Sequence, residues 1–99
     1  MTTPLTLIAT LTARPGHAEA VEAGLRQLVP PSQAEAGCLQ YNLHLHLHQE
    51  QPSRFIMVEQ WQDAAALSAH QQTAHFLHFV QTCGSLLEQV DHQLMQRIL

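Results

Sequence analysis

Hydrophobic residues in this 99-residue chain recur with two different periods, and the order of those periods limits the possible folds. Residues 5–13, 38–48, 55–61 and 91–99 alternate in polarity or are rich in β-branched and aromatic side chains, which predicts strands. Residues 17–29 and 73–90 repeat apolar side chains every three or four positions, which predicts helices, and Asp63 can cap a short helix over residues 64–70. Pro30 and Pro31 are expected to kink or end the first helix, with Gly37 as a helix stop.

The expected order is therefore β-α-β-β-α-β, with one hairpin in the middle of the chain. This order is typical of an α+β, ferredoxin-like sandwich, in which the helices cover one face of a four-stranded sheet. The length fits a single domain, residues 1–99, which buries only about 60–65% of its unfolded surface. Because the other face of such a sheet is left open, we expect a second copy to cover it in a homodimer.

Charge and composition exclude several classes of protein. Four Lys and Arg residues against eight Asp and Glu residues leave a net charge of −4, which argues against nucleic acid as a partner. No apolar run approaches the roughly 20 residues that span a membrane, and the N-terminus lacks the basic region of a signal peptide, so we expect a cytoplasmic protein. Cys38 and Cys83 form no CxxC motif and are expected to be buried, reduced thiols.

The stretch YNLHLHLHQE, residues 41–50, places histidine at every second position. Alternate side chains of a strand point to opposite faces, so Asn42, His44, His46 and His48 share one face and the leucines share the other. Two histidines at this spacing can chelate zinc only if a third ligand arrives from another strand or helix, and nothing at short range supplies one. We therefore expect no metal site.

Several spaced motifs agree with one known family. They are LIATLTARPG near the N-terminus and, within residues 37–79, GCLQYNLH, the Pro52 and Phe55 of a turn into a strand, EQW, AL followed by AH, and HFLHF. Together they resemble the antibiotic biosynthesis monooxygenase family of small dimeric α+β barrel proteins, which includes quinol monooxygenases. The resemblance implies that two copies form a dimeric α/β barrel, and that the sheet face opposite the helices lines a cavity open to a planar aromatic molecule.

The alternation within the two middle strands orders the candidate residues for that cavity. Ile56 and Val58 are wholly apolar and are assigned to the helix side, which sends Glu59 and Trp61 toward the cavity. The leucines and Tyr41 form the better helix-packing face of the preceding strand. Its polar residues, Asn42 and His44, are therefore expected to point into the cavity.

The expected catalytic residues are Asn42 as an amide that orients the ligand, His44 as a base and Trp61 as a stacking platform. The expected substrate contacts are Glu59, His70, His75, Phe55, Met57 and Phe76. Glu59 needs a partner when buried, and His70 and His75 are its natural partners. Trp61 as simple core filling and the two helical histidines as exposed residues stay open alternatives, and His46 and His48 are expected to be wet.

The resemblance implies a cofactor-independent monooxygenase that oxidises a hydroxylated aromatic substrate, a quinol or an anthrone-like compound, with dioxygen. The substrate supplies the electrons, so neither flavin nor haem is expected, and the sequence contains no GxGxxG loop. A non-catalytic small-molecule-binding or stress-response protein with the same barrel remains an alternative. Haem degradation is less favoured, because Ala9 and Val80 stand where haem-degrading relatives carry an asparagine and a haem-ligating histidine.

Overall fold

Strands and helices follow one another along the chain in the expected order. The computed structural model describes residues 3–47 and 52–99. The elements are β1 (Leu5–Ala13), α1 (Ala18–Gln33), β2 (Cys38–Leu45), β3 (Arg54–Trp61), α2 (Ala64–His70), α3 (Ala74–Cys83), a 3-10 turn (Gly84–Leu86) and β4 (Leu87–Gln96). No helix within the described ranges is long and apolar enough to cross a membrane.

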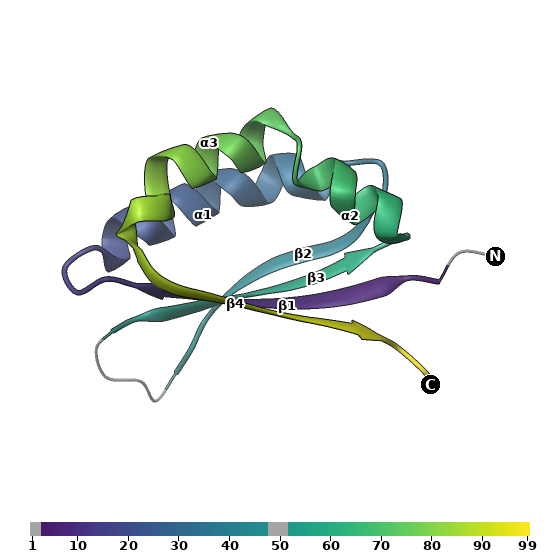
Figure 1. Cartoon of the computed structure of the whole chain (residues 1–99), viewed down its shortest axis with the longest axis horizontal. Coiled ribbons are helices and arrows are strands. Elements are labelled where there is room, and N and C mark those ends of the chain that lie inside the picture. The colour runs from purple at the N-terminus through teal and green to yellow at the C-terminus, as the bar shows by residue number, and fades with distance from the viewer. Residues whose placement is uncertain (1–2, 48–51) are drawn as a thin grey trace.

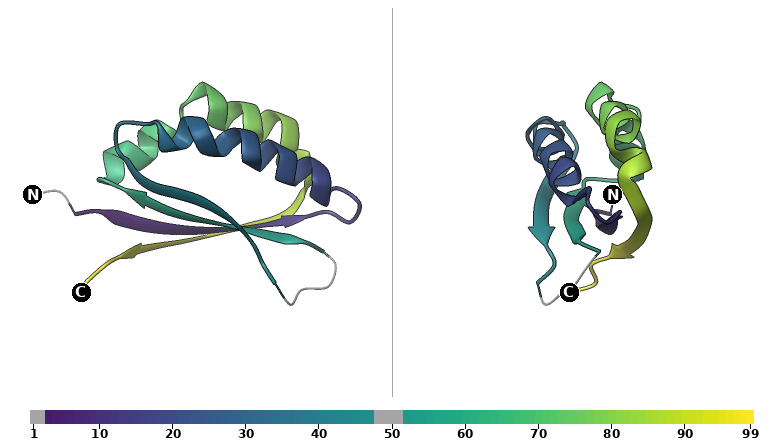
Figure 2. Two further views of the ribbon diagram at one scale, coloured as in Figure 1. Left: turned by 180° about the vertical axis from the view of Figure 1, so that it is seen from behind. Right: turned by 90° about the vertical axis from the view of Figure 1, so that its left-hand side faces the viewer.

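The strands form one antiparallel sheet in the order β2-β3-β1-β4. All the helices lie over the same face of this sheet, and the opposite face is left open (Figure 1). Seen from the end of the molecule, α1 and α3 lie side by side above the strands (Figure 2). The α+β, ferredoxin-like fold expected from the sequence is therefore confirmed.

The starts of α2 and α3 agree with the predicted capping residues, whereas the end of α1 differs from the prediction. Asp63 accepts a hydrogen bond from the backbone N–H of Ala66 at 2.8 Å, and Thr73 caps α3 in the same way. Pro30 and Pro31 do not end the first helix, because α1 continues to Gln33. Both prolines lie in the last turn of α1, and only Ser32 and Gln33 follow them in the helix.

Gly37 is not the expected helix stop, because α1 is capped by Ala34. Its lack of a side chain has another use, since a Cβ atom at this position would collide with that of Ala66 in α2. The two cysteines are not joined. Cys83 is buried and Cys38 is half-buried, so only one of them is the buried thiol that the sequence predicts.

The final strand begins earlier than its sequence pattern suggests. Residues up to 90 were expected to continue the last helix, but α3 ends at Cys83 and β4 begins at Leu87. A register shift between Thr12 and Ala13 pairs Leu87 with Ala13 and Val90 with Leu11. Leu87 and Val90 therefore face the same side although only two residues, Glu88 and Gln89, lie between them. The β-bulge therefore places apolar residues three positions apart on one face, the spacing that the sequence analysis interpreted as a helix.

The two faces of β3 are the reverse of those expected. Phe55, Met57, Glu59 and Trp61 point into the space between sheet and helices, where all four are buried. Ile56 and Val58 lie half-buried on the open face. The larger side chains fill the wide gap beneath the helices and pack against buried residues of α1 and α3, namely Val21, Leu25, Leu28, Phe79 and Cys83.

Candidate functional site

The structure separates the residues that were expected to share one cavity. Asn42 pairs with Val58 and His44 with Ile56, so both lie exposed on the open face, away from Trp61. They border a groove of about 600 Å³ along the edge of β2 and α1. His46 is half-buried rather than wet, and His48 lies outside the described residues. The expectation that Asn42 and His44 face the same cavity as Trp61 is wrong.

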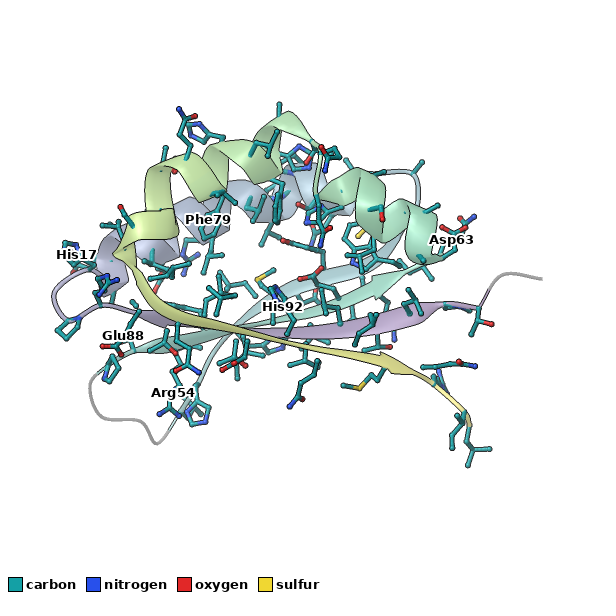
Figure 3. All side chains as sticks on the ribbon, in the orientation of Figure 1. His17, Arg54, Asp63, Phe79, Glu88 and His92 are labelled. Carbon is teal, nitrogen blue, oxygen red and sulfur yellow. The ribbon has the colours of Figure 1, made fainter. Side chains whose placement is uncertain are left out.

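A second cavity, of about 260 Å³, lies between the sheet and the helices. Most of its lining is apolar and comes from every strand and from α1 and α3. The polar or titratable side chains among the lining residues are Tyr41, Glu59 and His92. Three residues expected to contact substrate, Glu59, Met57 and Phe76, do line this cavity, and Figure 3 shows His92 beneath the helical layer. Phe55 borders the groove instead.

Glu59 is the buried carboxyl group of this cavity, with only 4% of its surface exposed. The indole Nε1–H of Trp61 donates a hydrogen bond to its Oε1 at 2.9 Å. Burial raises the pKa of Glu59 to about 7, against the opposing effect of the Trp61 hydrogen bond, and the charge of Glu35 raises that pKa further. A carboxyl group that titrates near neutral pH is suited to accept and return a proton.

The two helical histidines meet a carboxylate that the sequence reasoning missed. Oε2 of Glu35, in the connection between α1 and β2, lies 2.7 Å from Nδ1 of His70 and 2.7 Å from Nε2 of His75. His70 ends α2 and is buried, whereas His75 lies in the first turn of α3 and is 25% exposed. The expectation that Glu59 is their partner is therefore wrong. The only signal in the sequence was two histidines that needed an acceptor.

This arrangement determines the proton positions of both rings. A carboxylate oxygen only accepts, so His70 donates through Nδ1 and His75 through Nε2. Burial lowers the pKa of His70, while the hydrogen bond and charge of Glu35 oppose that shift. His70 in its neutral form therefore keeps its lone pair on Nε2.

Aromatic side chains connect this histidine pair to Glu59. The ring centroid of His70 lies 4.6 Å from that of Trp61, 5.2 Å from Tyr41 and 5.0 Å from Phe76. Trp61 has no exposed surface, so it acts as core filling as well as the hydrogen-bond donor to Glu59. Burial, followed by the charge of Glu59, raises the pKa of Tyr41, so its phenol remains protonated.

Glu35, His70 and His75 are also the one group in the described part of the chain whose ligand atoms could hold a metal ion, all lying within 4.8 Å of one another. Two histidines and a carboxylate are a ligand set that zinc accepts. The distances of 2.7 Å are those of charge-assisted hydrogen bonds, with a proton between each ring and the carboxylate. The observed geometry therefore supports a hydrogen-bonded group.

Comparison with known proteins finds relatives that match most of this chain. It is 36% identical over 83 residues to "Putative monooxygenase YcnE" of Bacillus subtilis, covering 84% of this chain and 85% of that protein. It is 33% identical over 93 residues to "Probable quinol monooxygenase YgiN" of Escherichia coli, covering 85% and 89% of the two chains.

Solved structures agree with these sequence relatives. The crystal structure of PA3566 from Pseudomonas aeruginosa superposes with a TM-score of 0.92 at 56% identity, covering 100% of this chain and 98% of that one. Rv0793 from Mycobacterium tuberculosis gives a TM-score of 0.89 at 26% identity, with coverage of 98% and 97%. The family model described as "Antibiotic biosynthesis monooxygenase" matches residues 4–82. The chain therefore belongs to the antibiotic biosynthesis monooxygenase family.

Proposed function

We propose that this protein is a cofactor-independent monooxygenase that oxidises a hydroxylated aromatic compound, with Glu59 as the base. The monooxygenase names of its family and relatives support an oxidoreductase activity at the coarse level. The observation that carries the finer proposal is a buried carboxyl group with a pKa of about 7 on the wall of an apolar cavity. Such a group can take a phenolic or benzylic proton near neutral pH.

The reaction needs no electron source other than its substrate. Glu59 removes one proton, and the resulting anion passes one electron to dioxygen. The substrate radical and superoxide combine to form a carbon-bound peroxide. Loss of the second hydrogen from that carbon, with cleavage of the O–O bond, leaves a carbonyl group and releases the other oxygen as water. The substrate thus loses two hydrogens and gains one oxygen.

The surrounding residues assist each of these tasks. The Trp61 N–H stabilises the carboxylate of Glu59 before it takes the proton, because hydrogen bonding favours the charged form. Tyr41 pairs directly with Glu59 across β2 and β3, and its protonated phenol can donate to the substrate anion. The apolar walls exclude water, which strengthens both interactions. The base is therefore assigned to Glu59 rather than to His44 on the open face.

Oxygen uptake with a panel of quinols and anthrones tests this assignment. Glu59→Gln should lower turnover about 10²-fold or more, the usual scale for a lost general base, while His44→Ala should retain the wild-type rate. The wild-type kcat/KM should rise with pH through a midpoint near 7, as the carboxyl group ionises. If His44→Ala abolishes uptake and Glu59→Gln does not, the base lies on the open face.

The same panel separates the alternative functions. Binding of aromatic ligands without oxygen uptake from any of them would identify a non-catalytic binding protein. A stoichiometric haem complex seen by absorbance would instead favour haem degradation.

We also propose a homodimer formed through the open face of the sheet. Ile8, Ile56 and Val58 lie half-buried on this face, and Met95 of β4 is 42% exposed there. A contiguous apolar surface of this kind is typical of an interface between subunits.

A further inference from the structure

His92 lines the same cavity as Glu59 but comes from the edge strand β4. The strand β1 lies between β3 and β4. Leu7 of β1 pairs with Glu59 on one side, and Ala9 pairs with His92 on the other. Leu7 and Ala9 point to the same face, so Glu59 and His92 both project toward the helices, as Figure 3 shows for His92.

The sheet geometry gives the spacing between these two residues. They are two strands apart and offset by two residues along the strand. With strands about 4.8 Å apart and a rise of about 3.4 Å per residue, their Cα atoms lie about 12 Å apart. No hydrogen bond joins the two side chains in the described structure. Glu59 and His92 therefore line the cavity from strands that are not neighbours in the sheet.

Ala9 and Met57 lie between them, and the rest of the cavity lining is mostly apolar. A ligand that fits this space has a flat apolar body with polar groups at its ends. An aromatic ring with oxygens para to one another, and a hydrogen bond of about 2.8 Å at each, spans about 11 Å. Side chains on one face of a sheet stand roughly perpendicular to it, so the polar atoms of Glu59 and His92 are separated by about as much as their Cα atoms, about 12 Å, which is close to that span.

We propose that His92 binds the second oxygen of the substrate, so that the cavity selects aromatic rings with an oxygen at each end. This inference rests on the proposed function, because it uses the same cavity and the same base. A neutral imidazole accepts a hydrogen bond from a hydroxyl group and donates one to a carbonyl group. His92 can therefore bind a second oxygen that is either a hydroxyl or a carbonyl group, whereas an aromatic ring with one oxygen loses this contact.

The position of His92 in the sheet leaves its side chain free to contact a ligand. His92 is exposed on the edge strand, where it pairs with the small Ala9 of β1, and the buried Met57 pairs with Ala9 from the other side. Its ring is therefore accessible to a ligand at the mouth of the cavity, while the carboxyl group of Glu59 lies at the buried end.

Calorimetric titration under argon, which prevents turnover, tests the inference with 1,4-dihydroxynaphthalene and 1-naphthol. The wild-type protein should bind the diol about 10-fold more tightly, the scale of one added hydrogen bond. His92→Leu should remove that preference by weakening the diol alone, and His92→Gln should restore much of it. Gln93→Leu is the matched control, since Gln93 is the next residue of β4 and points to the open face.

The outcomes separate this inference from the proposed function. Equal affinity of the wild-type protein for both ligands, or equal weakening of both by His92→Leu, overturns the role of His92 and leaves Glu59 as the base. An unchanged preference in His92→Leu does the same. If the wild-type protein binds neither ligand and takes up no oxygen with the quinol and anthrone panel, both the inference and the proposed function fail.

Discussion

Replacing Glu59 with glutamine measures how strongly the cavity penalises a negative charge. Burial raises the pKa of this carboxyl group from 4.5 to about 7, so the folded protein retains a proton that the unfolded chain releases. Between these two pH values the folded state binds more protons, and its stability falls as the pH rises. The shift corresponds to about 3 kcal/mol, lost in full above pH 7.

Glutamine has the same shape but no charge, and its side-chain oxygen can still accept the hydrogen bond from Trp61. Glu59→Gln should therefore match the wild-type stability near pH 4.5 and exceed it by about 3 kcal/mol at pH 8. His70 acts in the other direction, because its lowered pKa costs stability as the pH falls below 6.5. Both proteins contain His70, so its effect cancels in the difference between them.

Urea denaturation followed by circular dichroism between pH 4.5 and 8.5 gives this difference directly. The protein concentration is held fixed, because the stability of an oligomer depends on it. Glu88→Gln is the matched control, since Glu88 is exposed on β4 and its replacement should shift the curve little at any pH. A difference between Glu59→Gln and wild type that does not change with pH would refute the reasoning.

Three further predictions concern the helices, the open face and the shared carboxylate. Gly24→Ala should destabilise the protein by about 1–3 kcal/mol, because the new Cβ would lie 2.5 Å from the Cys83 sulfur. In a Cys83→Ala background the same change should be neutral or stabilising, and an equal cost in both backgrounds, measured by thermal or urea denaturation, would contradict the close contact. Ile56→Asp should convert the proposed dimer to monomers in light scattering without loss of helix content, and an unchanged mass means that the interface lies elsewhere. Glu35→Ala should lower the free energy of unfolding by about 1–3 kcal/mol for each histidine N–H that loses its acceptor. It should destabilise the protein more than His75→Ala does, and equal melting temperatures of the two variants would contradict this ranking.

Local rules in the sequence predicted most of the fold because the relevant interactions are local. Alternation predicted β1 with its observed bounds, and the side-chain oxygens of Asp63 and Thr73 predicted the helix starts. The faces of β3 were harder, because alternation divides a strand into two sets of side chains without saying which set meets the helices. Both sets contain several apolar side chains, so the choice of Ile56 and Val58 for the helix side because neither is charged was wrong, and the larger side chains of the other set fill that space.

The candidate site was predicted in part for the same reason. Glu59 and Trp61 were identified from their own strand, and they do contact one another. Glu35 was missed because it meets His70 and His75 across 35 and 40 residues, and no short-range pattern reports such a contact. His92 was passed over because its position depends on the register of β4 against β1, which a bulge alters.

The two hydrogen bonds of Glu35 also connect segments of the protein that lie far apart in the sequence. Its carboxylate holds the end of α2 and the start of α3 to the connection that precedes β2. Small units of a protein open locally with less free energy than complete unfolding requires. Both histidines bond the same oxygen atom, so loss of this one carboxylate would release the end of α2 and the start of α3 together. Because α3 also lines the cavity, Glu35 links the helix above the cavity to the buried His70.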